Sequence, residues 1–334
     1  MKLFDAKSFK LFLVLIMATA LCIPSMVTAK DYKFACSLGW MENESGQRQR
    51  FGFEAAVKEL GGTITFTDAN YDPKKQSDQI EAFIKMTPDA LFITPSDPAG
   101  ITPAVKRAVA AGIPVFIADA IVAGADCVTS VLSNDFGMGM YGIDWIAKRI
   151  GGKGKIGIID LPVNESWDLR GQGAMWALKS KYPDIEVVAK WSWDSTGAVT
   201  PRQAVDNMLT ANPKKGDLDA IWCAWDGAAM EGALAIKAAG RADEIVTTGI
   251  DGGKAAFDFI KQDTPFKMTL AQSIYTMSYL TVYYAHKYLA GEQVPRTVIA
   301  PVFGITKDEL KGIKNPEDYD IPGVAAEFGW VRVL

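Results

Sequence analysis

Short apolar runs alternate with longer amphipathic segments almost to the end of the chain. Runs such as "ALFIT" at 90–94 and "KIGIID" at 155–160 are apolar nearly throughout, which is typical of strands buried on both faces of a parallel sheet. The pattern predicts strands at 33–38, 63–67, 90–94, 115–118, 155–159, 186–191, 220–224, 245–248 and 267–271. It predicts helices at 47–60, 74–85, 101–111, 138–150, 167–181, 204–209, 228–239, 254–261 and 274–289. Strictly alternating strands and helices indicate an α/β fold.

A faint internal repeat suggests how these elements are grouped. The stretch "DALFITPSDPAG" begins at Asp89, and "DAIWCAWDGAAM" begins 130 residues later at Asp219. In both, a strand ends in a polar turn with an aspartate, and an Ala-rich helix follows. Since the offset is close to half the chain, we expect two similar doubly wound parallel-sheet domains. No low-complexity linker separates them, so the connections between them should be short.

The N-terminus has the three parts of a secretory signal peptide: a basic start, a short apolar run and a small-residue cleavage site. These parts are the lysines of the first ten residues, the segment 11–23, and Val27-Thr28-Ala29. We expect residues 1–29 to be removed by cleavage near Ala29/Lys30, which predicts a periplasmic location. An uncleaved membrane anchor is the alternative, but the apolar run is shorter than the roughly 20 residues that span a bilayer. The remaining 305 of 334 residues suit two domains.

Charge and rare residues exclude several classes of function. The formal net charge of −4 becomes −6 once the leader's three lysines and one aspartate are gone. A mildly acidic surface argues against a nucleic-acid partner. Cys36 and Cys223 lie in apolar runs and are expected to be buried thiols. A disulfide between any pair of Cys36, Cys127 and Cys223 is the alternative. The single histidine, His286, lies within a predicted helix, and no cluster of residues has the spacing of a metal site.

The residues that follow the predicted strands carry the candidate chemistry. In open parallel sheets, ligands bind beyond the carboxyl ends of the strands. In chain order, the side chains found there are Trp40, Asn43, Asp119, Arg170, Trp193, Trp225, Asp226, Asp251 and Gln272. Carboxylates accept hydrogen bonds from hydroxyls, Arg donates in a rigid fork, Gln does both, and an indole can cover the C–H face of a sugar. The set predicts a carbohydrate or polyol site.

Several of these residues also have an ordinary structural interpretation, and Arg170 could be a surface residue on a helix. Asp226 and Asp251 precede predicted helices and could be N-caps, and Trp193 and Trp225 could belong to the core. Trp222 is expected in the core, and Trp167 at the start of a helix as a packing residue. Arg170 falls in the first turn of a predicted helix, where a cation opposes the helix dipole, so we expect it to have a partner. Neither a Walker A motif nor a strand-linked Gly-x-Gly-x-x-Gly is present, so nucleotide binding has no support.

The chain resembles the ribose- and galactose-type periplasmic binding proteins of ABC importers over residues 30–310. The resemblance is carried by "GFEAAVKELGG", "ITPSDPAGITPAVKRAVAAGIPV", "SNDFGMG", "RGQGAMWAL", "DNMLTANP" and "TTGIDG", in this order and spacing. It implies a type I periplasmic binding protein fold of two doubly wound domains, which close on a ligand held between them. It places three hinge crossings near Asn134, Gln272 and Thr297. The N-terminal domain would then comprise 30–134 and 273–297, and the C-terminal domain 135–272 and 298–334.

The resemblance also implies roles for single residues. Asp119 matches the aspartate that grips sugar hydroxyls, Arg170 the arginine before Gly-x-Gly, and Trp193 the aromatic after the sixth strand. Asn43, Asp226, Asp251 and the hinge residue Gln272 match family positions as well. Three departures fall in the pocket: Ala120 replaces an arginine of ribose binders, Trp225 replaces an asparagine, and the paired aromatics expected near Ser45 and Gly46 are missing, with Trp40 as the candidate substitute. These departures point away from ribose itself and leave a short polyol, a deoxysugar or another pentose as alternatives.

The resulting prediction is a monomeric solute-binding protein that delivers a sugar or polyol to the membrane permease of an ABC importer, without a cofactor, a metal or an enzymatic activity. A sensor that presents its closed state to a chemoreceptor or histidine kinase is the alternative. A secreted enzyme that uses the carboxylates for acid–base chemistry is a further one. A repressor core is excluded by the leader and by the lack of a DNA-binding headpiece. The segment 311–334 has no predicted function and could wrap the surface of the second domain.

Overall fold

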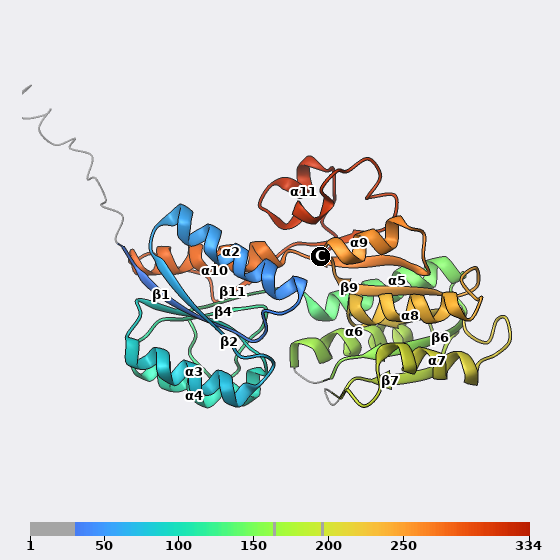
Figure 1. The fold of residues 1–334 in the computed structure, drawn as a ribbon, viewed down its shortest axis with the longest axis horizontal. Helices are drawn as coiled ribbons and strands as arrows, with labels where there is room; N and C mark the ends of the chain where they lie inside the picture. The colour runs from blue at the N-terminus through green and yellow to red at the C-terminus, as the bar shows by residue number, and fades with distance from the viewer. Residues whose placement is uncertain (1–30, 163–164, 195–196) are drawn as a thin grey trace, which may run out of the picture. The chain divides into compact units, whose positions relative to one another are not determined.

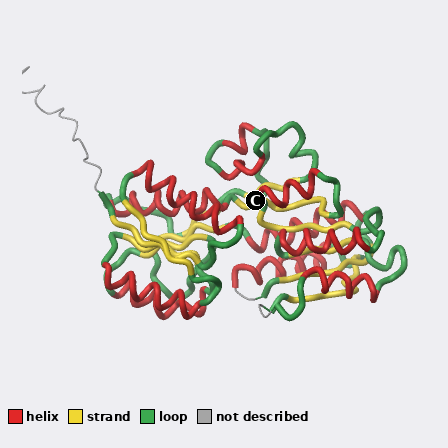
Figure 2. The backbone as a smooth tube through the Cα atoms, in the orientation of Figure 1, coloured by secondary structure: helices red, strands yellow, loops and turns green. Residues whose placement is uncertain are grey.

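Two six-stranded sheets, each covered by helices, form the framework of the computed structural model (Figure 1). The structure describes residues 31–162, 165–194 and 197–334. Every element named below lies in the compact unit Tyr32–Leu334. Figure 2 shows the strands of both sheets lying between helices, which is the layered arrangement expected of an α/β fold.

The first sheet has the strand order β11-β5-β4-β3-β1-β2, and all of its strand pairs are parallel. Its strands are β1 (Lys33–Leu38), β2 (Thr63–Asp68), β3 (Ala90–Thr94), β4 (Val115–Ala118), β5 (Thr129–Leu132) and β11 (Thr297–Ile299). Within β1, Ala35 faces one hydrophobic cluster, whereas Phe34, Cys36 and Leu38 face another. This strand is therefore buried on both faces, as its apolar sequence predicts.

Two helix pairs cover the first sheet, and we call the sheet with these helices the first lobe. Helices α3 (Pro73–Met86) and α4 (Pro98–Ala110) pack on one face, and α2 (Glu44–Leu60) and α10 (Ile274–Leu289) on the other (Figure 1). Asp72 and Asp97 cap α3 and α4 by accepting hydrogen bonds from backbone amides, and a proline follows each of them. A proline suits the first helical position, so α4 begins three residues earlier than its apolar pattern suggests.

The second sheet has the order β12-β10-β9-β8-β6-β7 and is parallel except for β12, which runs antiparallel to β10. Its strands are β6 (Gly154–Asp160), β7 (Ile185–Ser192), β8 (Ala220–Cys223), β9 (Val246–Asp251), β10 (Phe266–Gln272) and β12 (Val302–Ile305). With its helices it forms the second lobe. One face packs on α5 (Asp135–Ile150) and α6 (Glu165–Lys181), and the other on α7 (Pro201–Ala211), α8 (Asp226–Ala238) and α9 (Lys254–Lys261). Trp222 lies buried between β8 and the α5–α6 layer, so its predicted core role is confirmed.

The chain passes between the lobes at three places. It leaves the first sheet after β5 and enters α5, whose N-cap is Asn134. It returns after Gln272, the last residue of β10, to enter α10. It crosses again between β11, which begins at Thr297, and β12. Each lobe is therefore assembled from segments far apart in the sequence.

The remaining chain beyond β12 holds a short 3-10 helix, η1 (Pro316–Asp320), and α11 (Val324–Glu327). It packs on the second lobe, where Trp330 contacts Phe257 of α9 with ring centroids 5.9 Å apart. Within the described part of the chain, no helix is both long and apolar enough to cross a membrane.

Candidate functional site

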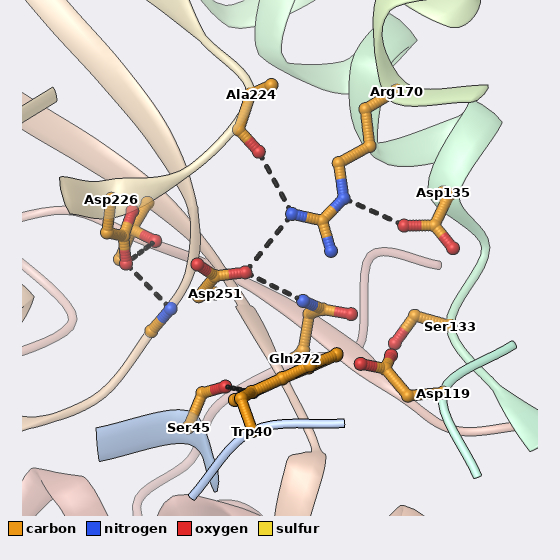
Figure 3. Close-up of polar contacts among 12 residues, drawn as sticks. Trp40, Ser45, Asp119, Ser133, Asp135, Arg170, Ala224, Asp226, Asp251 and Gln272 are labelled. Atoms are coloured by element: carbon orange, nitrogen blue, oxygen red, sulfur yellow. Dashed lines mark hydrogen bonds and ion pairs between the residues drawn. The ribbon is translucent and has the colours of Figure 1, made fainter. Parts of the chain in front are cut away.

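Arg170 of α6 is the centre of the polar network at the carboxyl ends of the second sheet's strands (Figure 3). Its Nε donates to Asp135 Oδ1 at 2.8 Å, and its Nη1 donates to the Ala224 carbonyl at 2.9 Å and to Asp251 Oδ1 at 3.1 Å. Gln272 Nε2 donates to the same Asp251 oxygen at 2.9 Å. Three predicted site residues, Arg170, Asp251 and Gln272, are thus directly connected. The expectation that Arg170 has a partner is confirmed, although it lies in the second turn of α6, because that helix begins at Glu165.

Asp135 belongs to this network but was not predicted. It opens α5, where the positive end of the helix dipole favours a carboxylate. The motif "SNDF" is an ordinary helix start. The one feature of the sequence that could have identified Asp135 as a site residue is its position next to the predicted hinge crossing at Asn134. Its role depends on the packing of α5 against α6, in which a Cβ on Gly139 would come within 1.9 Å of the Arg170 carbonyl oxygen.

Asp251 holds its carboxylate in place with an unusual backbone. Its φ is 132°, in a region that L-residues seldom adopt, and Gly252 and Gly253 follow with φ of 84° and 107°. Such strain costs roughly 1–3 kcal/mol and is concentrated at functional sites. A Cβ on Gly252 would lie 2.6 Å from the Tyr319 hydroxyl and 2.7 Å from Ala271 Cβ, so only glycine fits there.

Asp226 makes structural hydrogen bonds that differ from its predicted helix cap. Its Oδ2 accepts from the Gly252 amide at 2.7 Å and from Thr269 Oγ1 at 2.9 Å. The N-cap of α8 is Trp225, which makes no side-chain cap bond, and the N-cap of α9 is Gly253. The cap interpretations of Asp226 and Asp251 are therefore wrong. Asp226 instead fixes the loop that carries Asp251, while its buried Oδ1 has no partner within 31–162, 165–194 and 197–334.

Asp119 supplies a carboxylate from the first lobe, at the end of β4. It is 9% exposed and sits in the left-handed region with φ of 65°. Gln49 Nε2 of α2 lies 3.5 Å from its Oδ2, at the long limit of a hydrogen bond. Burial, and next the negative charge of Asp135, raise the pKa of Asp119 to about 8, although Arg170 opposes the rise. This carboxyl is therefore largely protonated at neutral pH.

The site has an excess of acids and of acceptor atoms. Burial raises the pKa of Asp135 and, most of all, that of Asp226. Arg170 pairs directly with Asp135 and Asp251, and its charge also acts on the buried Asp119 and Asp226. The side-chain oxygens Gln272 Oε1 and Gln49 Oε1 are also buried and have no partner among the residues that the structure describes. Buried acceptors without donors are costly, so this arrangement is suited to a ligand rich in hydroxyl hydrogens.

Both lobes carry candidate tryptophans beyond the ends of their strands. Trp40 stacks on Tyr71 with centroids 5.7 Å apart and contacts Trp167 of α6 at 5.3 Å, so it touches the second lobe. Trp40 Nε1 donates to Ser45 Oγ at 3.2 Å. Trp167 is a packing residue, as expected, and the side chain that it packs against is the candidate site residue Trp40. In the second lobe, the half-buried rings of Trp193 and Trp225 lie 6.4 Å apart.

Asn43 is placed at the edge of this aromatic group rather than in the arginine network. Its Oδ1 accepts from the Gly46 amide and caps α2, and its Nδ2 donates to the Tyr71 hydroxyl at 2.7 Å. The next residue, Glu44, reaches the second lobe: its carboxylate accepts from the backbone amides of Lys254 and Ala255, in the first turn of α9.

Burial and packing account for the cysteine and histidine side chains, which are the residues that could support other chemistry. Cys36, Cys127 and Cys223 are free and buried, and burial raises the pKa of each thiol. His286 packs edge-on against Tyr32 and Phe34. In the described segments, no group of three or more His, Cys, Asp or Glu side chains could hold a metal ion.

Comparison with known proteins agrees with this architecture. A family model described as a periplasmic binding protein domain matches residues 34–293. The ribose import binding protein of Bacillus subtilis is 29% identical over 82% of this chain and 87% of its own. The xylitol-binding protein of Mycolicibacterium smegmatis is 27% identical over 78% of this chain and 73% of its own. The solved structure of a periplasmic solute-binding protein of an ABC transporter from Actinobacillus succinogenes, with bound D-allose, has a TM-score of 0.76 at 25% identity, covering 85% of this chain and 100% of that one.

The predicted two-domain fold and the predicted resemblance are both confirmed by these matches. Since the family model covers well over half of the sequence, the chain belongs to the periplasmic binding protein family.

Proposed function

We propose that this protein binds a sugar or polyol at the Arg170 network and delivers it to the membrane permease of an ABC importer. The observation that carries the proposal is the cluster of buried acceptors around one guanidinium. Asp251 offers a carboxylate and Gln272 an amide oxygen, the protonated Asp119 can both accept and donate, and Arg170 is held in place by three acceptors. A polyhydroxylated ligand supplies the matching donors, and indoles beside the network can cover its C–H faces.

The relatives support this ligand class by their chemistry. Their names and the bound molecule refer to ribose, xylitol and D-allose, which differ in ring form and length but are all neutral polyhydroxy compounds. The word import in the name of the Bacillus protein favours transport over the sensor alternative. We further propose that no covalent chemistry takes place at the site, so that the carboxylates act as hydrogen-bonding groups.

The proposed site draws on both lobes. Trp40, Asn43 and Asp119 belong to the first lobe; Arg170, Trp193, Trp225, Asp226 and Asp251 belong to the second; and Gln272 lies at a crossing between them. A ligand that contacts both lobes favours the arrangement in which they approach each other. We propose hinge motion about the crossings near Asn134, Gln272 and Thr297, with domains of 30–134 plus 273–297 and of 135–272 plus 298–334.

The location and assembly state complete the proposal. The basic and apolar start of the chain supports a leader cleaved near Ala29, and the relatives are periplasmic or import proteins, which supports a periplasmic location. The leader itself falls outside the described residues. We propose that the mature protein acts as a monomer.

A thermal-shift screen of purified residues 30–334 tests the proposal. Ribose, xylitol, D-allose and L-leucine would each be added, and tryptophan emission would be recorded in parallel. A ligand that binds only the folded state raises the unfolding midpoint by mass action. We expect at least one of the three polyhydroxy compounds, and not leucine, to raise the midpoint. The same compound should have a smaller effect on Asp251→Asn, which removes the negative charge beside Arg170 and replaces one carboxylate oxygen with an amide donor.

A response to leucine alone would contradict the proposed ligand class. The lack of any response to the three polyhydroxy compounds, in protein with a cooperative unfolding transition, would contradict it as well. A response that survives unchanged in Asp251→Asn would place binding elsewhere on the molecule.

A further inference from the structure

The family model ends at residue 293, but the chain continues to residue 334 and returns to the candidate site. We call the part after β12, residues 306–334, the C-terminal segment. It is anchored on the second lobe: the Trp330 ring packs on Phe257 and Phe303, and the Val333 amide donates to the Val302 carbonyl at 2.9 Å. This anchoring gives η1 a fixed position next to the end of β9.

Tyr319 of η1 contacts the main chain of two site residues. Its single hydroxyl hydrogen is shared between two carbonyl oxygens, that of Gln272, which is the nearer, and that of Asp251 at 3.3 Å. The residue is 3% exposed, so no bulk water competes for these carbonyls. The ring packs between Phe257 and Phe303, at 5.6 and 6.1 Å, and its position therefore does not depend on the hydroxyl. Gly252 lacks the Cβ that would displace this hydroxyl.

The neighbouring Asp320 contacts the first lobe. Its carboxylate accepts from the Tyr275 amide at 2.9 Å, at the start of α10, and forms an ion pair with Arg48 of α2. Thr276 Oγ1 donates to the Asp320 carbonyl. Asp320 is 2% exposed, so this is a buried connection and not a surface ion pair. The C-terminal segment thus contacts the end of β9, the crossing after β10, and two helices of the first lobe.

We infer that the C-terminal segment positions the binding site, and that the Tyr319 hydroxyl fixes the backbone of Asp251 and Gln272 so that their side chains meet Arg170. Tyr319 is a positioning residue, because its hydroxyl acts on the main-chain carbonyls of Asp251 and Gln272. The inference rests on the proposed function for its effect on ligand affinity.

The strained backbone of Asp251 explains why such a support is needed. At a φ of 132°, this residue can relax unless its neighbours hold it. Asp226 holds the loop from the amide of Gly252, and Tyr319 holds it from the carbonyl of Asp251. Without the hydroxyl, one of the two restraints on this peptide is lost, and the carboxylate that joins Arg170 to Gln272 should become mobile.

The test compares Tyr319→Phe with Tyr279→Phe. The first change removes only the hydroxyl and keeps the aromatic packing. The second removes the Tyr279 hydroxyl on α10, whose hydrogen-bond partner is Glu59 and not a residue of the site. Hydrogen exchange of the ligand-free proteins at the amides of residues 251–253 would be measured first. Calorimetric affinity would follow, with whichever of ribose, xylitol and D-allose stabilises the wild type most.

We expect Tyr319→Phe to exchange faster at residues 251–253 and to bind about three- to tenfold more weakly, the effect of one lost hydrogen bond. Tyr279→Phe should match the wild type in both measurements. Wild-type exchange at 251–253 in Tyr319→Phe, or faster exchange with wild-type affinity, would overturn the inference. If the wild type binds none of the three compounds, the proposed function fails. The hydrogen exchange of amides 251–253 in Tyr319→Phe then decides by itself whether Tyr319 holds this loop.

Discussion

At the scale of single residues, the burial of Arg170 governs the stability of the site. The guanidinium is 2% exposed and its charge is compensated by Asp135 and Asp251. Removing one partner of a buried ion pair leaves an uncompensated charge and typically costs about 3–5 kcal/mol. We therefore expect Arg170→Met to lower the free energy of unfolding by about this amount, as measured by urea denaturation.

A surface arginine provides the control for this prediction. Arg107 pairs with Glu81 in an exposed position, so Arg107→Met should cost at most about 1 kcal/mol. Adding Asp135→Asn to Arg170→Met should restore part of the loss, because the unpaired carboxylate is then removed. Equal losses in the two arginine variants would contradict the importance of the buried network.

The raised pKa of Asp119 leads to a prediction about pH. Its folded-state pKa of about 8 exceeds the ordinary value of 3.8, so the native state binds more protons than the unfolded state between these values. Its contribution to the free energy of unfolding therefore falls as pH rises from about 4 to about 8. Asp119→Asn has no carboxyl to ionise at this position. The thermal midpoint of the variant minus that of the wild type should therefore increase as pH rises from 5 to 8.

Asp78→Asn, on the exposed side of α3, is the matched control for Asp119→Asn and should differ from the wild type by a constant amount over this range. If the difference in thermal midpoint between Asp119→Asn and the wild type does not change with pH, the folded protein does not hold Asp119 in its protonated form.

The candidate residues could be predicted from their positions, but their partners could not. Strand ends are visible in an apolar pattern, and Arg170, Asp251 and Gln272, found in this way, do form one network. Asp135 was missed, because its partner is 35 residues away and meets it only through helix packing. The buried bonds of Asp226 to Gly252 and Thr269 were missed for the same reason.

At the scale of elements, the contact of α5 with α6 depends on two glycines. A Cβ on Gly139 would lie 1.9 Å from the Arg170 carbonyl oxygen, and one on Gly173 would lie 2.0 Å from that of Phe136. Gly139→Ala should force the helices apart and lower the free energy of unfolding by about 1–3 kcal/mol, the usual cost of overpacking. The measurement is again urea denaturation.

Gly171 lies on α6, as Gly173 does, but it has room for a Cβ, whose nearest contact would be Asp160 Cβ at 3.4 Å. Gly171→Ala should therefore be neutral or stabilising by up to about 1 kcal/mol, because alanine favours a helix. A loss in Gly171→Ala equal to that in Gly139→Ala would contradict the close-packing explanation.

Every strand and helix predicted from periodicity has a counterpart in the structure, because long amphipathic helices and strands buried on both faces leave strong patterns. Three strands were missed: β5, β11 and β12. They have only three or four residues each, and β5 (TSVL) and β11 (TVI) also begin with polar residues, unlike the equally short but wholly apolar β4 (VFIA) and β8 (AIWC). All three adjoin the crossings between lobes, where pairing with distant chain segments decides the structure.

At the scale of the whole Tyr32–Leu334 unit, Glu44 links the two lobes. The carboxylate from α2 accepts from two amides at the start of α9, where the helix dipole favours a negative charge. Glu44→Ala should lower the free energy of unfolding by about 0.5–2 kcal/mol, as for a lost helix cap, and should increase the radius of gyration of the ligand-free protein in small-angle X-ray scattering.

Glu54→Ala is the control, since Glu54 lies on the same helix and pairs only with Arg50 in the described contacts. It should leave the radius of gyration at the wild-type value. A Glu44→Ala protein with an unchanged radius and unchanged stability would show that this contact does not hold the lobes together.

The interleaved chain also determines when the protein can fold during synthesis. The strands β1 to β5 are complete by residue 132, but α10, which covers Phe92 and Phe116 on one face of their sheet, comes only at 274–289, and β11 at 297–299. A ribosome releases the chain from its N-terminus, so more than half of the protein must emerge before this face is covered. A nascent chain should therefore stay open to proteases until almost all of it has been made, and a delay of this kind keeps a polypeptide unfolded long enough for a translocation channel to accept it.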